Sequence, residues 1–124
     1  MGYKIKCYVR FNNSGEAGDP EPYGRILVHP DGEQEAGFVV WEQENKYNST
    51  PTVASVTSIV EISSGDRPEE MHFSGNVMES DFNNMDDLLA RSDEGLVSGP
   101  AGKEIKLPGG ESSGDYVAIT WNYE

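Results

Sequence analysis

The sequence predicts an all-β fold, an antiparallel β-sandwich of about seven strands with one short helix in a connection. Apolar and polar residues alternate from the N-terminus onward, β-branched residues fill a long central stretch, and 14 Gly and 7 Pro supply many turns. A chain of 124 residues has the size of one domain, so we expect a single sandwich over 1–124, with a barrel as the alternative.

The first strand has the clearest pattern. Tyr3, Ile5, Cys7, Val9 and Phe11 are separated by single polar residues, a period of two that predicts one buried and one exposed face. Glycine, proline and acidic residues divide the rest of the chain into similar segments. We expect the further strands at 24–29, 37–44, 52–62, 71–78, 103–107 and 115–123.

One segment has helical spacing instead. Phe82, Met85 and Leu89 repeat with a period close to that of an α-helix. Asp81, or the serine before it, can cap the N-terminus of such a helix. This spacing predicts a helix over 82–91.

The apolar face of each expected element predicts the core. We expect most of the core to come from Ile5, Cys7, Val9, Phe11, Val39, Trp41, Val56, Val60, Leu88, Val117, Ile119 and Trp121.

The charge of the chain limits its partners. Its 22 Asp and Glu against 9 Lys and Arg give a net charge of −13, which repels nucleic acids and anionic lipids. No apolar run approaches the roughly 18 residues of a membrane-spanning helix, and the first residues have a strand pattern rather than that of a signal peptide. We therefore expect neither direct nucleic-acid binding nor a membrane span, and the compartment stays open.

No group of residues predicts catalysis. Gly110–Gly114 matches the G-x-S-x-G pattern of a hydrolase nucleophile, but a strand is expected after it instead of a helix, and both histidines precede it. His29 and His72 would act as a pair only if the fold brought them together, which nothing in the sequence indicates. We expect a protein that is not an enzyme and needs no cofactor.

The composition favours a recognition module, with a lectin-like site for a glycan or a cell-surface ligand. The loops of a sandwich present amides that bind hydroxyl groups and rings that pack on the apolar face of a sugar. Burial in the core is the alternative for the two tryptophans, which lie in expected strands. The candidate ligand-binding residues are Tyr23, Trp41, Asn45, Tyr47, Asn48, Trp121 and Tyr123.

Calcium is the one metal that the sequence suggests, because calcium takes six to eight oxygen ligands and acidic loops supply them. Asp31, Glu33 and Glu35 are spaced by two in an expected turn and are the candidate ligands. A solvated acidic loop without a metal is the alternative.

A second interpretation is an acidic decoy that imitates a nucleic acid and blocks a basic groove on a partner protein. High negative charge spread over the surface as salt adaptation, without any partner, is the alternative. The densest acidic region supplies the candidate partner-binding residues, which are Glu69, Glu70, Glu79, Asp81, Asp86, Asp87, Asp93 and Glu94.

Positive charge gathers on the polar side of the first expected strand. Lys4, Lys6 and Arg10 lie there with a tyrosine between them. They predict either an anion site or, as the favoured interpretation, cross-strand pairing with Glu42 and Glu44. An exposed edge strand would also allow copies of the chain to form a homo-oligomer.

Overall fold

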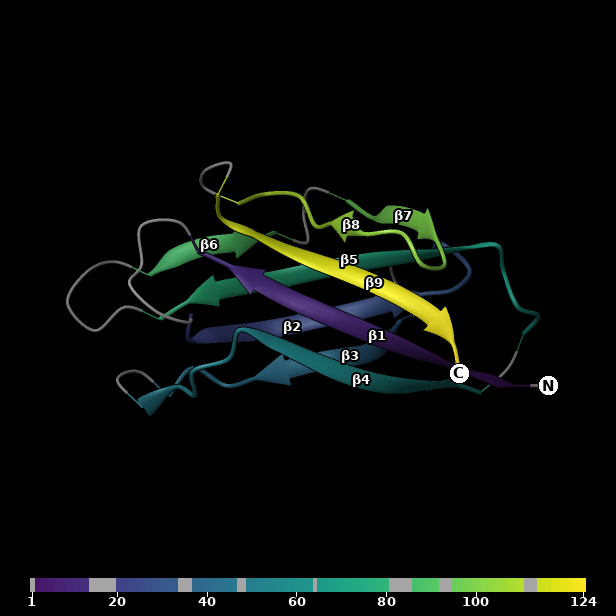
Figure 1. Ribbon diagram of the computed structural model, residues 1–124, viewed down its shortest axis with the longest axis horizontal. Helices are drawn as coiled ribbons and strands as arrows, with labels where there is room; N and C mark the ends of the chain where they lie inside the picture. The colour runs from purple at the N-terminus through teal and green to yellow at the C-terminus, as the bar shows by residue number, and fades with distance from the viewer. Residues whose placement is uncertain are drawn as a thin grey trace.

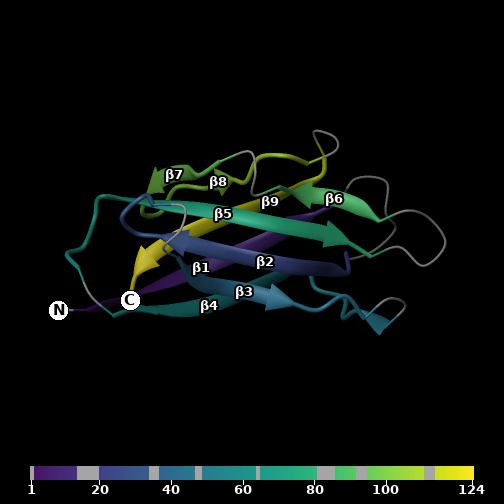
Figure 2. The ribbon, with the colours of Figure 1, turned by 180° about the vertical axis from the view of Figure 1, so that it is seen from behind.

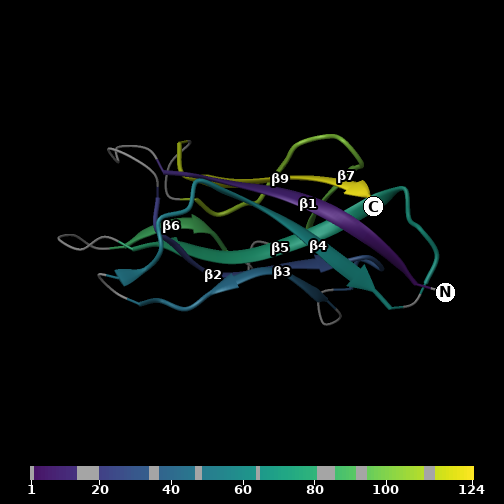
Figure 3. The same ribbon diagram turned by 60° about the horizontal axis from the view of Figure 1, so that its bottom comes forward.

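The predicted sandwich is confirmed. The computed structural model describes residues 2–13, 20–33, 37–46, 49–63, 65–80, 86–91, 95–110 and 114–124. These residues form two antiparallel sheets packed face to face (Figure 3). The described residues contain no helix, and thus none that could span a membrane.

The four-stranded sheet has the order β4-β1-β9-β8 (Figure 1). Its strands are β1 (Tyr3–Asn12), β4 (Ser55–Ile62), β9 (Tyr116–Tyr123) and β8 (Ile105–Lys106). β1 pairs with β4 on one side and with β9 on the other, so the first and last strands of the chain lie side by side at its centre.

The five-stranded sheet lies behind it, as Figure 2 shows from the other side. Its path runs β3 (Phe38–Gln43), β2 (Pro22–His29), β5 (Glu70–Glu79) and β6 (Asp87–Ala90). β7 (Val97–Pro100) pairs with the other half of β5, so two short strands share one side of a long strand.

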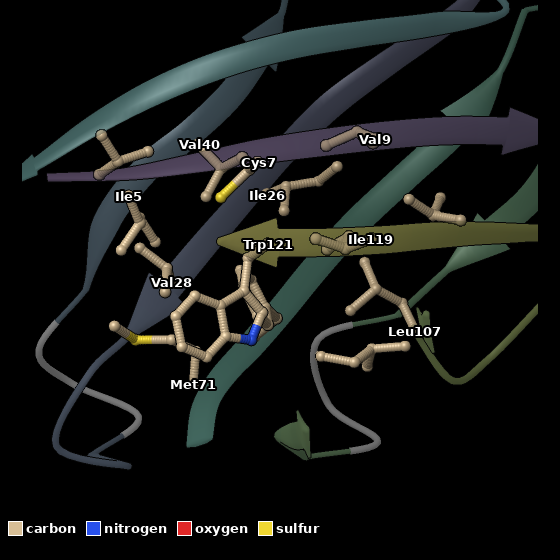
Figure 4. Packing of buried hydrophobic residues seen from close by; sticks show 14 of the residues in the cluster. Ile5, Cys7, Val9, Ile26, Val28, Val40, Met71, Leu107, Ile119 and Trp121 are labelled. Carbon is tan, nitrogen blue, oxygen red and sulfur yellow. The ribbon is translucent and has the colours of Figure 1, made fainter. Parts of the chain in front are cut away.

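The core lies between the two sheets, where every second residue of each long strand points inward (Figure 4). Ile5, Cys7 and Val9 of β1 are fully buried. Trp121 of β9 is also fully buried, and its indole N–H donates to the Gly99 carbonyl 2.9 Å away. This bond satisfies the one polar group of the largest buried side chain and ties β9 to β7 of the opposite sheet.

Most of the predicted core is confirmed. Trp41, Val56 and Leu88 are only partly buried, and the first two pack against the core from its periphery. The predicted members that are buried are Ile5, Cys7, Val9, Phe11, Val60, Val117, Ile119 and Trp121.

The prediction for Val39 is wrong, because a β-bulge changes the inward face of β3. β2 and β3 pair Ile26 with Trp41 and then Leu27 with Val39, which leaves Val40 as an extra residue. Val40 is 4% exposed and Val39 is 48% exposed. Strict alternation cannot anticipate this shift, since the extra residue reverses the side to which its neighbours point.

The helix predicted over 82–91 is wrong over the part that the structure describes. Residues 87–90 form β6, and β5 pairs Met78 with Leu88 and Val77 with Ala90. Leu89, between those two pairs, is fully buried. A short apolar run is compatible with a bulged strand as well as with a helix. Here the pairing with β5 makes this segment a strand. Residues 82–85 of the predicted helix and its cap candidate Asp81 lie outside the described residues.

The bulge in β3 predicts opposite effects for two adjacent valines. Val40→Ala removes two buried methyl-sized groups and should lower the free energy of unfolding by about 2 kcal/mol. Val39→Ala removes exposed surface and should change it by less than about 0.5 kcal/mol. Urea denaturation of both variants measures the difference, and equal losses would contradict the bulged register.

Cys7 should be chemically inert in the folded protein. Burial raises the pKa of its thiol from 9.0 to about 12, so the reactive thiolate is absent at pH 8. Because the folded-state pKa is the higher one, the stability that this group contributes is present below pH 9.0 and is lost as the pH rises toward 12. We expect iodoacetamide at about pH 8 to label the unfolded chain and not the native protein. Equal labelling rates, followed by mass spectrometry, would contradict the burial of Cys7.

Candidate functional site

The aromatic residues proposed as ligand-binding groups are used mainly to build the fold. Trp121 is in the core, and the centres of the Trp41 and Phe11 rings lie 4.8 Å apart. The Tyr123 hydroxyl donates to the Pro68 carbonyl, and the Arg67 guanidinium lies 4.9 Å from the centre of the Tyr123 ring. These three aromatic side chains therefore have internal partners.

The other members of that group do not gather into one site. Tyr23 of β2 donates its hydroxyl to a carboxylate oxygen of Asp86. Asn45 lies after β3, and its side-chain oxygen is 3.5 Å from the Thr50 hydroxyl. Tyr47 and Asn48 lie outside the described residues.

The candidate calcium ligands are only partly described. Asp31 and Glu33 are exposed in the connection after β2, and Glu35 lies outside the described residues. No cluster of three or more His, Cys, Asp or Glu side chains suited to a metal occurs among the residues that the structure places. Calcium binding by this loop stays a prediction.

The described acids of the decoy hypothesis are distributed over both ends of the five-stranded sheet. Glu70 is the first residue of β5 and Glu79 its last, and Glu79 is buried. Glu69 is exposed beside Glu70, whereas Asp86 and Asp87 lie beside Glu79 at the start of β6. Asp81, Asp93 and Glu94 lie outside the described residues.

The strand register brings the two histidines together. His29 of β2 and His72 of β5 are direct cross-strand partners. The buried His29 ring has Nδ1 2.9 Å from the Glu33 carbonyl and Nε2 2.7 Å from the Ser74 hydroxyl. A Cβ atom at Gly37 would lie 2.9 Å from the His29 ring, so the connection after β2 packs directly on it. We therefore assign His29 a structural role, holding this connection to the sheet.

A polar hollow of about 680 Å³ opens on the outer face of the five-stranded sheet. Arg25 Nε lies 3.0 Å from Glu42 Oε2 across it, and both side chains are more than half exposed. Gly24 has φ 127°, and a Cβ there would lie 1.9 Å from the Asn76 carbonyl oxygen, so only glycine fits. The hollow is lined by Gly24, Arg25, Glu42, Gln43, Glu44 and Asn76.

The outer face of the four-stranded sheet is the second candidate surface. It comprises the outward-pointing residues of β1, β4, β9 and β8, and it includes Lys4, Lys6, Arg10 and Lys106. The predicted pairing with Glu42 and Glu44 is wrong, because β3 belongs to the other sheet.

Arg10 finds different partners on this face. Its Nη2 lies 3.1 Å from Glu104 Oε2, and its Nη1 donates to the Tyr116 hydroxyl over 3.2 Å. The hydrogen bond to Glu104 is the main reason why the pKa of Arg10 is raised. Lys106 Nζ lies 4.2 Å from the centre of the Tyr116 ring, which places a second cation on the same tyrosine.

Two large apolar side chains are exposed beside these cations. Tyr8 of β1 is 46% exposed and Ile59 of β4 is 54% exposed. The pairs Tyr8–Thr57 and Lys6–Ile59 place Tyr8 and Ile59 diagonally across two neighbouring strands. The alternation of β1 indicates the outward direction of Tyr8, but only the register with β4 reveals Ile59 as its neighbour.

One solved structure is similar to this chain over its whole length. It is the crystal structure of the Cry23Aa1 and Cry37Aa1 binary protein complex, and the matching chain is Cry37Aa1. The two chains are 33% identical, the match covers 100% of this chain and 98% of that chain, and the TM-score is 0.89. No protein-family model and no curated protein matches the chain. Sequence identity at this level over the full length shows common ancestry, and the chain therefore belongs to the Cry37Aa1 family.

Proposed function

We propose that this chain is the non-catalytic partner component of a binary toxin and that it acts by binding a second protein similar to Cry23Aa1. The observation that carries the proposal is the match to Cry37Aa1, 33% identical over the entire chain. A TM-score of 0.89 over 98% of Cry37Aa1 indicates that this chain has the same arrangement of strands on which a binding surface would lie.

The exposed features of the sandwich support a role in binding. The inward-pointing residues of a sandwich fill its core, and its outward-pointing residues remain available for contacts with other molecules. Here those residues include the exposed apolar side chains of Tyr8 and Ile59 and the guanidinium of Arg10 on one sheet, and both Tyr and Arg are enriched at protein interfaces.

Carbohydrate binding in the polar hollow is a second candidate function. The guanidinium of Arg25, the carboxylate of Glu42 and the amide of Asn76 line it, and these groups can donate to and accept from sugar hydroxyls. This candidate retains the lectin-like hypothesis but moves the site from the loop aromatics to the face of β2, β3 and β5.

Binding to Cry23Aa1 tests the first proposal. We expect immobilised Cry23Aa1 to retain this chain with a Kd of about 1 μM or lower, since a family member should present a related interface. Cry37Aa1 serves as the positive control, and an unrelated β-sandwich of similar net charge controls for non-specific attraction. Retention of Cry37Aa1 without retention of this chain in surface plasmon resonance would overturn the proposal.

A glycan array tests the second candidate. We expect a defined sugar to bind the wild-type protein and to lose at least about tenfold in affinity with Arg25→Ala, because the hollow loses its cationic donor. Lys103→Ala, which removes an exposed cation outside the lining of the hollow, is the matched control. An array without hits would discard carbohydrate binding and leave the first proposal intact.

A further inference from the structure

We propose that the outer face of the four-stranded sheet, centred on Tyr8, Lys6 and Ile59, is the surface that binds the partner protein, and that it receives an acidic patch of that partner. This inference rests on the proposed function and assigns its site.

The charge of this face differs from that of the rest of the molecule. Four of the nine Lys and Arg residues lie on it, and among the described residues their acidic neighbours are Glu61, Glu104 and Glu124. The other five cations therefore share the rest of the described residues with 12 of the 15 acids that the structure places. A protein with a net charge of −13 thus keeps one nearly balanced face, on which an acidic partner meets the least repulsion.

Lys6 is the cation best placed to bind a carboxylate of a partner. It is exposed, and its neighbours in register are Ile59 on β4 and Asn122 on β9, neither of them acidic. Arg10, by contrast, is already bound to Glu104. A carboxylate of the partner can approach Lys6 without displacing an internal partner, which favours a net gain from the ion pair.

Tyr8 and Ile59 supply the apolar centre that such an interface needs. They are two of the three large hydrophobic side chains exposed among the described residues, and the third, Val39, lies on the other sheet. Thr57 and Asn122 flank them with uncharged hydrogen-bonding groups. An exposed tyrosine beside an aliphatic side chain, with polar residues around both, is the composition of an interface centre.

A second copy of this chain is the less favourable occupant. Two copies each carry a net charge of −13 and repel each other as they approach. A face-to-face dimer would also place Lys6 of each copy on a surface where like cations outnumber the acids. An acidic patch on a different protein would not bring two such faces, with their like cations, into contact, and that protein need not share the net charge of this chain.

Two matched pairs of variants test the proposal against immobilised Cry23Aa1. Lys6→Glu and Lys46→Glu change the net charge equally, but only the first lies on the proposed face. Tyr8→Thr and Val39→Thr both remove an exposed apolar side chain and keep a residue that favours strands. Urea denaturation of all four variants confirms that each is folded before its affinity is measured.

We expect Lys6→Glu and Tyr8→Thr each to weaken binding by at least about tenfold, and Lys46→Glu and Val39→Thr to change it by less than about twofold. The wild-type affinity should also fall between about 0.05 and about 0.5 M NaCl, and Lys6→Glu should flatten this dependence.

The outcomes separate the two proposals. Wild-type binding with no effect of Lys6→Glu and Tyr8→Thr would overturn the assignment of this face and leave the proposed function intact. Equal losses with Lys6→Glu and Lys46→Glu would also overturn it, because net charge alone would explain them. Failure of the wild-type chain to bind, with Cry37Aa1 binding normally, would overturn the proposed function and this inference with it.

Discussion

The packing of β1 between its two neighbours and against the opposite sheet is the constraint on which the fold depends. Ile5, Cys7 and Val9 of its inward face are fully buried, and Trp121 on the adjacent strand packs beside them. Because the inward face of β1 is fixed, its outward face is fixed as well. The same alternation that buries Cys7 therefore places Lys6 and Tyr8 on the surface.

Sequence reasoning was sufficient where the period of two was unbroken. β1 and β9 could be predicted almost to the residue, because large apolar residues recur at every second position of each strand. It failed where strands carry an extra residue, as at Val40, and in the segment around Leu89, because a bulge depends on the pairing partner and not on the local sequence. The short β7 could not be predicted for a related reason. Its own composition does not favour a strand, and its pairing with β5 stabilises it as one.

The candidate site was predictable only in part. The positive charge beside Tyr8 is visible in the sequence, but Ile59 joins it through a register between strands about 50 residues apart in the chain. The cross-strand pairing of His29 with His72 has the same origin. Aromatic side chains, which suggested a ligand site, serve largely to fill the sandwich, because a chain of this size needs its large rings for the core. The net charge of the sequence likewise does not reveal that positive and negative side chains are nearly equal in number on one sheet face.

The pairing of β1 with β9 has a consequence for synthesis of the protein. Ile5 pairs with Tyr123, so the central ladder of the four-stranded sheet joins residues from opposite ends of the chain. During translation β1 is synthesised before β9, and the two strands can pair only after the residues between them have also left the ribosome. Until then β1 lacks its partner β9, so the burial that raises the pKa of the Cys7 thiol is incomplete. The nascent chain, rather than the finished sandwich, is therefore the form in which oxidants can reach the single cysteine.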